Sequence, residues 1–124
     1  MPPGKEIKVI LSENADKVYT ELNEIVGEEK LKGINSSFHQ SLLRSITRAK
    51  DLLKKNPFSG NQINKKKIPK KYFKNYDINN LWRIELANRW RLTYTIRGTD
   101  VEIINFILDV FDHKGYDKLF GYKH

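Results

Sequence analysis

Four charged side chains that could bind and cleave a phosphodiester lie within one short stretch, NLWRIELANRWRLTYTI, residues 80–96. They are Arg83, Glu85, Arg89 and Arg91. An arginine forms paired, planar hydrogen bonds to a phosphate and stays charged at any working pH, and a glutamate can act as a general base. We therefore expect this stretch to form an anion site.

The chemistry that fits these residue types is RNA cleavage without a metal ion. That reaction needs a base to activate the ribose 2′-hydroxyl, cations to stabilise charge on the phosphate oxygens, and an acid to protonate the departing 5′-oxygen. Glu85 and the arginines can supply the first two parts. His113 and Tyr116, in the stretch DVFDHKGYDKLF, can supply the third, since histidine titrates near neutral pH.

Less specific interpretations of these residues stay open. Glu85 could form an ordinary ion pair with one arginine across neighbouring strands, worth under about 1 kcal/mol. His113 follows Asp112 and could be a surface or capping residue. His39 and His124 are interpreted as structural or incidental.

The net charge of +8 is concentrated in the middle of the chain. Eleven basic residues and one acidic residue lie between Arg44 and Lys74, a local charge of +10. Within this segment the loop lysines are Lys65, Lys66, Lys67, Lys70, Lys71 and Lys74. Such a block predicts a polyanionic partner, nucleic acid before membrane. The alternative is a solvated, lysine-rich loop that aids solubility.

A hairpin is predicted to position the arginines. Its apolar positions alternate along two strands, and they are Trp82, Ile84, Leu86, Trp90, Leu92 and Tyr94. Arg83, Glu85 and Arg91 occupy the other positions and therefore lie on the opposite face. Cross-strand neighbours are about 5 Å apart, so we expect these side chains to converge. The two tryptophans are predicted to pack in the core rather than stack on bases, and Asn88 suits a turn with positive φ.

The remaining patterns predict a small α+β domain. Residues 6–11 alternate as a strand, the 15–26 pattern is a helix that Gly27 ends, and Ser37 with Gln40 fits a capping box for a second helix ending near Asn56. Residues 57–80 are predicted to be a loop with at most one short strand, and residues 101–111 a central strand. The result is one domain, residues 1–124, with residues 1–5 flexible. Two helices cover one face of a twisted antiparallel sheet, in the order β-α-α-β-β-β with room for one further short strand.

Several function classes are excluded or unsupported by the composition. The chain has no cysteine, so a disulfide framework, a thiolate metal site and a cysteine nucleophile are impossible. Serine nucleophile motifs, phosphate-binding loops and metal-ligand spacings are absent, and no cofactor is predicted. No stretch has the length of a signal peptide's apolar core or of a membrane span, so the expected location is the cytoplasm.

The order of elements, with LWRIELANRWRLTYTI followed by FDHKGYDKLF, resembles the RelE/ParE superfamily of toxins from prokaryotic type II toxin–antitoxin modules. The resemblance covers nearly the whole chain from Ile7. Its strongest part runs from Trp82 to Tyr116, where WRLTY, residues 90–94, matches a motif of an aromatic or histidine, then Arg-Leu, a small residue and Tyr.

For the RelE-like branch the resemblance implies cleavage of messenger RNA on the ribosome. By position, Arg91 matches the central phosphate-binding arginine and Arg83 a basic residue of the preceding strand. Glu85 departs from the pattern, because several members have a second basic residue there; it could serve as the base or weaken the site. His113 or Lys114, then Tyr116 or Phe120, correspond to the C-terminal basic and aromatic residues.

The implied partners are a cognate antitoxin, messenger RNA and ribosomal RNA, without a membrane. The loop lysines, Arg89 and Lys114 are expected to contact RNA. Two other functions stay open. The ParE-like branch has the same fold without the RNase residues and acts on DNA gyrase, and a third possibility is an inactive homologue that only binds nucleic acid.

Overall fold

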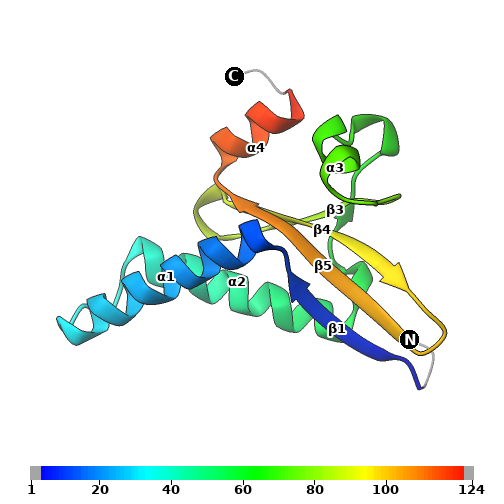
Figure 1. The fold of residues 1–124 in the computed structure, drawn as a ribbon. Coiled ribbons are helices and arrows are strands. Elements are labelled where there is room, and N and C mark those ends of the chain that lie inside the picture. The colour runs from blue at the N-terminus through cyan, green and yellow to red at the C-terminus, as the bar shows by residue number, and fades with distance from the viewer. Residues whose placement is uncertain (1–3, 122–124) are drawn as a thin grey trace.

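A computed structural model describes residues 4–121, in which helices lie on both sides of one twisted sheet (Figure 1). Two long helices, α1 (Glu13–Leu31) and α2 (Phe38–Lys55), cover one face. Two short helices, α3 (Lys70–Asn75) and α4 (His113–Phe120), lie over the other face. The α+β class is confirmed. His124 and residues 1–3 of the segment expected to be flexible lie outside the described residues.

The sheet has five strands in the order β1-β5-β4-β3-β2. Their bounds are β1 Glu6–Leu11, β2 Asn61–Gln62, β3 Trp82–Glu85, β4 Arg91–Gly98 and β5 Glu102–Phe111. As predicted, β3 and β4 form an antiparallel hairpin and β5 lies inside the sheet. The prediction of a wholly antiparallel sheet is wrong for β1, which pairs parallel to β5. Alternating apolar residues look the same in either strand direction, so the pattern could not reveal this.

The two long helices follow the sequence pattern except at one end. Ser37 caps α2 as expected, because its Oγ accepts a hydrogen bond from Gln40 N at 3.1 Å. The prediction that Gly27 ends the first helix is wrong, since α1 continues to Leu31 and the chain turns at Gly33, where φ is +79°. A glycine in an exposed helix costs only about 1 kcal/mol relative to alanine, which the buried neighbour Val26 can offset.

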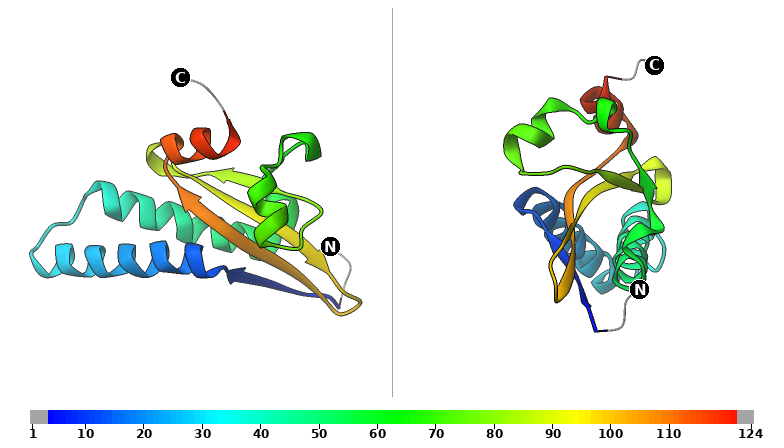
Figure 2. Two further views of the ribbon diagram at one scale, coloured as in Figure 1. Left: turned by 45° about the horizontal axis from the view of Figure 1, so that its top comes forward. Right: turned by 90° about the vertical axis from the view of Figure 1, so that its right-hand side faces the viewer.

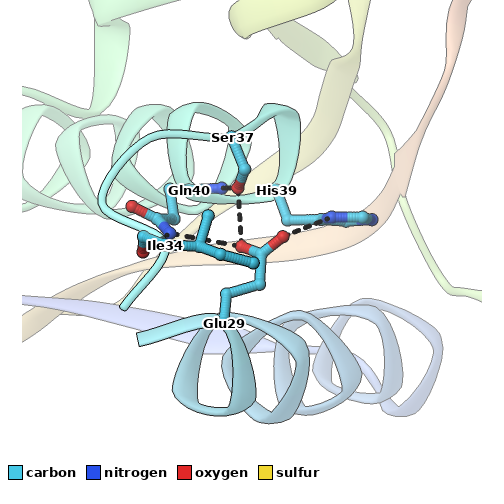
Figure 3. Close-up of polar contacts among 5 residues, drawn as sticks. All are labelled: Glu29, Ile34, Ser37, His39 and Gln40. Atoms are coloured by element: carbon cyan, nitrogen blue, oxygen red, sulfur yellow. Dashed lines mark hydrogen bonds and ion pairs between the residues drawn. The ribbon is translucent and has the colours of Figure 1, made fainter. Parts of the chain in front are cut away.

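A cluster of polar side chains joins the end of α1 to the start of α2 (Figure 3). The Glu29 carboxylate accepts hydrogen bonds from Ser37 Oγ at 2.6 Å and from Gln40 Nε2 at 3.3 Å, and it lies 3.4 Å from His39 Nδ1. The Ser37 hydrogen bond lowers the pKa of Glu29. Farther along α2, Ser45 Oγ accepts a hydrogen bond of 3.1 Å from Ala87 N, so α2 also contacts the turn between β3 and β4.

Replacing Ser37 with alanine should lower the free energy of unfolding by about 1 kcal/mol, the usual value of an N-cap. Glu29 has a lowered pKa in the folded state, so its contribution is present above the unfolded carboxyl pKa and is lost as the pH falls through the folded value. The difference in free energy of unfolding between the unaltered protein and Ser37→Ala should therefore shrink below about pH 4. Urea unfolding across pH measures it, with exposed Ser36→Ala as the matched control; an equal loss in the control would contradict the assignment.

The segment 57–80 is more ordered than predicted. It contains two 3-10 turns, Pro57–Ser59 and Lys65–Lys67, besides β2 and α3. The short strand was foreseen, but a description as a loop is wrong for α3. Gly60 lets the segment approach the sheet, because a Cβ there would lie 2.6 Å from the carbonyl oxygen of Arg83. The basic segment therefore enters the sheet directly beside β3.

The molecule has two apolar clusters, one on each face of the sheet. The larger lies under α1 and α2 and includes Leu42, Leu53, Leu92 and Tyr94, with both tryptophans packed against it. The smaller lies under α3 and α4, and it contains Ile63, Ile68, Tyr72, Ile78, Leu81 and Leu108. None of the helices in the described chain is long and apolar enough to cross a membrane.

Candidate active site

Arg83 and Arg91 lie on the face of the sheet turned away from α1 and α2, as the alternation predicts. Both meet Tyr116 of α4. Arg83 Nη1 donates a hydrogen bond to Tyr116 Oη at 2.8 Å, and the Arg91 guanidinium lies 4.6 Å from the centre of the same ring. The structure therefore brings the two arginines together.

Arg91 carries the least satisfied polar group of the site. Its Nε and Nη1 are buried and have no hydrogen-bond partner in the structure. Glu85 is its direct cross-strand neighbour, yet no ion pair joins the two, and the Glu85 side chain is exposed. An unpaired buried N–H group costs about 1 to 3 kcal/mol, more when it is charged. Such a group is suited to an anion that completes its hydrogen bonds.

A cleft of about 390 Å³ opens beside Arg91 at the hairpin turn. Its lining residues are Glu85, Leu86, Arg89, Trp90 and Arg91. The turn is tight, with φ of 59° at Asn88 and 65° at Arg89, and only the first was foreseen. Positive φ is uncommon for arginine, so the turn holds Arg89 in a costly conformation beside the cleft.

α4 is the part of the site that sequence patterns missed. Asp112 caps it through a 2.8 Å hydrogen bond from Gly115 N, and Gly121 ends it with φ of +77°. Its Tyr116 is buried, at 1% exposure, and stacks on Phe120 with ring centres 4.2 Å apart. His113 is the half-buried first residue of the helix, and Lys114 is exposed. In this state Tyr116 covers the arginines.

The basic residues expected to contact RNA lie on the same face as the arginines. Lys65, Lys66 and Lys67 form the second 3-10 turn, Lys70, Lys71 and Lys74 belong to α3, and all six are exposed. Figure 2 shows that α3 and α4 both lie over this face, and the rings of Tyr72 and Phe120 connect them, with centres 6.3 Å apart. The lysines and the arginine pair therefore flank one surface.

A buried polar chain beneath this surface had no sequence signal. Tyr72 Oη lies 2.7 Å from Thr93 Oγ1, and Thr93 stands opposite Arg83 in the β3–β4 register. Burial raises the pKa of Tyr72 and of Asp109, the β5 partner of Thr93. This chain anchors α3 to the strands that carry the arginines.

Comparisons with known proteins agree with this architecture. No protein-family model matches the sequence, and no curated protein matches it. A solved structure, a YoeB/ParE toxin from Agrobacterium tumefaciens, superposes with a TM-score of 0.54 at 12% sequence identity. The match covers 86% of this chain and 98% of that one.

The chain shares the fold of this YoeB/ParE toxin. At 12% identity the likeness concerns the fold and does not choose between the branches. Within this shared fold, the arginine pair, Glu85 and Tyr116 lie at the ends of β3, β4 and β5. The catalytic and RNA-binding roles that the sequence suggests for these residues remain predictions.

Proposed function

We propose that this protein is the toxin of a type II toxin–antitoxin module and that it acts as an endoribonuclease on messenger RNA at the ribosome. The observation that carries the proposal is the Arg91 guanidinium, whose buried Nε and Nη1 lack partners beside Arg83 and across from Glu85. The RelE/ParE fold supports it.

The arrangement suits an in-line transfer within the RNA chain. Glu85 takes the proton of the ribose 2′-hydroxyl, whose oxygen attacks the adjacent phosphorus while the bond to the 5′-oxygen breaks. Arg91 and Arg83 stabilise the charge on the phosphate oxygens. Tyr116 or His113 gives a proton to the departing 5′-oxygen, which leaves a 2′,3′-cyclic phosphate. A phosphate can reach Arg91 only after Tyr116 moves aside.

A second function is a toxin directed at DNA gyrase or another protein. The observation that favours it is Glu85, an acid exposed where several RelE-like members have a basic residue. In that case the arginines would contact a protein surface.

Brief expression in a bacterial host, followed by mapping of transcript ends, separates the two functions. We expect new transcript ends within translated codons and no DNA-damage response. Intact transcripts together with a DNA-damage response would favour the gyrase target and reject the ribonuclease.

The proposed antitoxin should carry an acidic extended or helical segment that lies over the sheet and the basic surface. Its charge would compensate the +10 of residues 44–74. We expect co-expression of the neighbouring small gene to abolish toxicity, and unchanged toxicity would contradict this partner.

A further inference from the structure

A second cleft lies on the same face of the sheet, between α3, α4 and the end of β5. It encloses about 380 Å³, within the range of small-ligand sites. Its lining residues are Lys71, Asp109, Phe111, Gly115, Lys118 and Leu119. One carboxyl group, two lysines and two apolar side chains therefore surround one space, and the mechanism above uses none of them.

Asp109 is the only acidic group lining this cleft. It is half buried, and Tyr72, Lys71 and Asn14 lie near its carboxyl. A carboxylate offers about four acceptor positions, so these neighbours leave capacity for a further donor. The strand register places Asp109 two strands from Arg83 on the same row of the sheet, because Asp109 pairs with Thr93 and Thr93 pairs with Arg83.

Two aromatic rings connect the cleft to the arginine pair. Phe111 lines the cleft and meets Tyr116 edge to face, with ring centres 5.6 Å apart. The same Tyr116 ring lies against Arg91. A polymer that places one phosphate on the arginines therefore has the cleft in its immediate neighbourhood.

The charged side chains that line the cleft limit which class of ligand can bind there. A free phosphate would meet the Asp109 carboxyl, and a metal cation would meet Lys71 and Lys118. A nucleotide within a strand satisfies all three groups, since its phosphates are anionic and its base can donate hydrogen bonds. Phe111 and Leu119 offer apolar surface to the base.

We propose that this cleft binds a nucleobase that carries an exocyclic amine, with the amine donating to Asp109 and the flanking phosphates lying near Lys71 and Lys118. The inference rests on the proposed function, which supplies RNA as the ligand. Cytosine donates from its amine at position 4, whereas uracil has at that position a carbonyl oxygen that a carboxylate repels, and its only donor on this edge is the neighbouring N3–H. The cleft should therefore prefer cytosine to uracil.

The test compares two ligands that differ at this position and cannot be cleaved. Fluorescent oligo-2′-deoxycytidylate and oligo-2′-deoxyuridylate lack the 2′-hydroxyl, and their affinities for the full chain are measured by fluorescence anisotropy. We expect about tenfold tighter binding of the cytidine oligomer. Asp109→Asn, whose amide can both donate and accept, should reduce the preference to less than about twofold.

Asp100→Asn is the matched control, because it removes the same charge from an exposed position before the opposite end of β5. It should keep the full preference. Lys118→Gln should weaken both oligomers alike and keep the preference, which also tests the cleft if Asp109→Asn fails to fold. Thermal melting verifies the fold of each variant.

Equal affinity of the unaltered protein for the two oligomers would overturn the inference, as would an unchanged preference in folded Asp109→Asn. These failures are distinct from failure of the proposed function. A preference that depends on Asp109, without cleavage of ribose-containing RNA, would reject the nuclease and retain the cleft. Cleavage of RNA without a preference for cytosine would retain the nuclease and reject the proposed base site in the cleft.

Discussion

Replacing Arg91 with alanine should slow RNA cleavage about a hundredfold to a thousandfold, a loss of about 2.7 to 4 kcal/mol of transition-state stabilisation. Its Nε and Nη1 are buried and lack hydrogen-bond partners in the free protein, so once Tyr116 has moved aside they can bind an anion without first losing a hydrogen bond of their own. The rate is measured under single-turnover conditions on RNA bound to ribosomes and on free RNA, because the reaction is proposed to occur on the ribosome.

The same change should leave the fold intact. Burying unpaired guanidinium N–H groups costs free energy, and their removal offsets the packing lost with the side chain. Arg91→Met keeps more of that packing and should unfold at a denaturant concentration equal to or above that of the unaltered protein. A strongly destabilised Arg91→Met would show that the guanidinium is structural.

Arg97 provides the matched control for Arg91. It is an arginine of the same strand, exposed near its other end, where Nη2 donates to the Asp77 carbonyl oxygen at 2.7 Å. Arg97→Ala should cleave at nearly the unaltered rate. If Arg97→Ala and Arg91→Ala lost activity equally, a general loss of positive charge would explain both, and the phosphate site would be refuted.

The central features of the site could be predicted from the sequence because they depend on local rules. The two-residue period of a strand places Arg83 and Arg91 on one face whatever the rest of the molecule does. The Ser37 cap likewise requires only a hydroxyl at the residue before a helix. Neither prediction needs knowledge of distant contacts.

The parts that the sequence did not reveal depend on tertiary contacts. Isolated helices as short as α3 and α4 are marginal in water, and here burial of Tyr72 and Tyr116 stabilises them. The direction of β1 and the contact between Tyr72 and Thr93 also join segments far apart in the chain. The covering of the arginines by Tyr116 belongs to this class, so no local pattern could have predicted it.

Neutralising the lysine turn should produce the second large effect. We expect Lys65→Gln, Lys66→Gln and Lys67→Gln together to weaken binding of single-stranded RNA about a hundredfold at 0.1 M salt. Each phosphate contact contributes about 0.7 to the slope of log affinity against log salt for single strands, so three contacts change the slope by about 2. Affinities at several salt concentrations measure both the loss and the slope.

The control removes three exposed lysines from the other side of the molecule. Lys17, Lys30 and Lys32 belong to α1 or its C-terminal cap, on the face opposite the arginines, and their replacement by glutamine changes the net charge by the same amount. If RNA contacts the basic surface beside α3, the control should keep nearly the full salt slope. Equal slopes in the two triple variants would mean that the chain attracts RNA through its net charge alone. The position of the lysine turn beside the arginine pair would then have no role in binding.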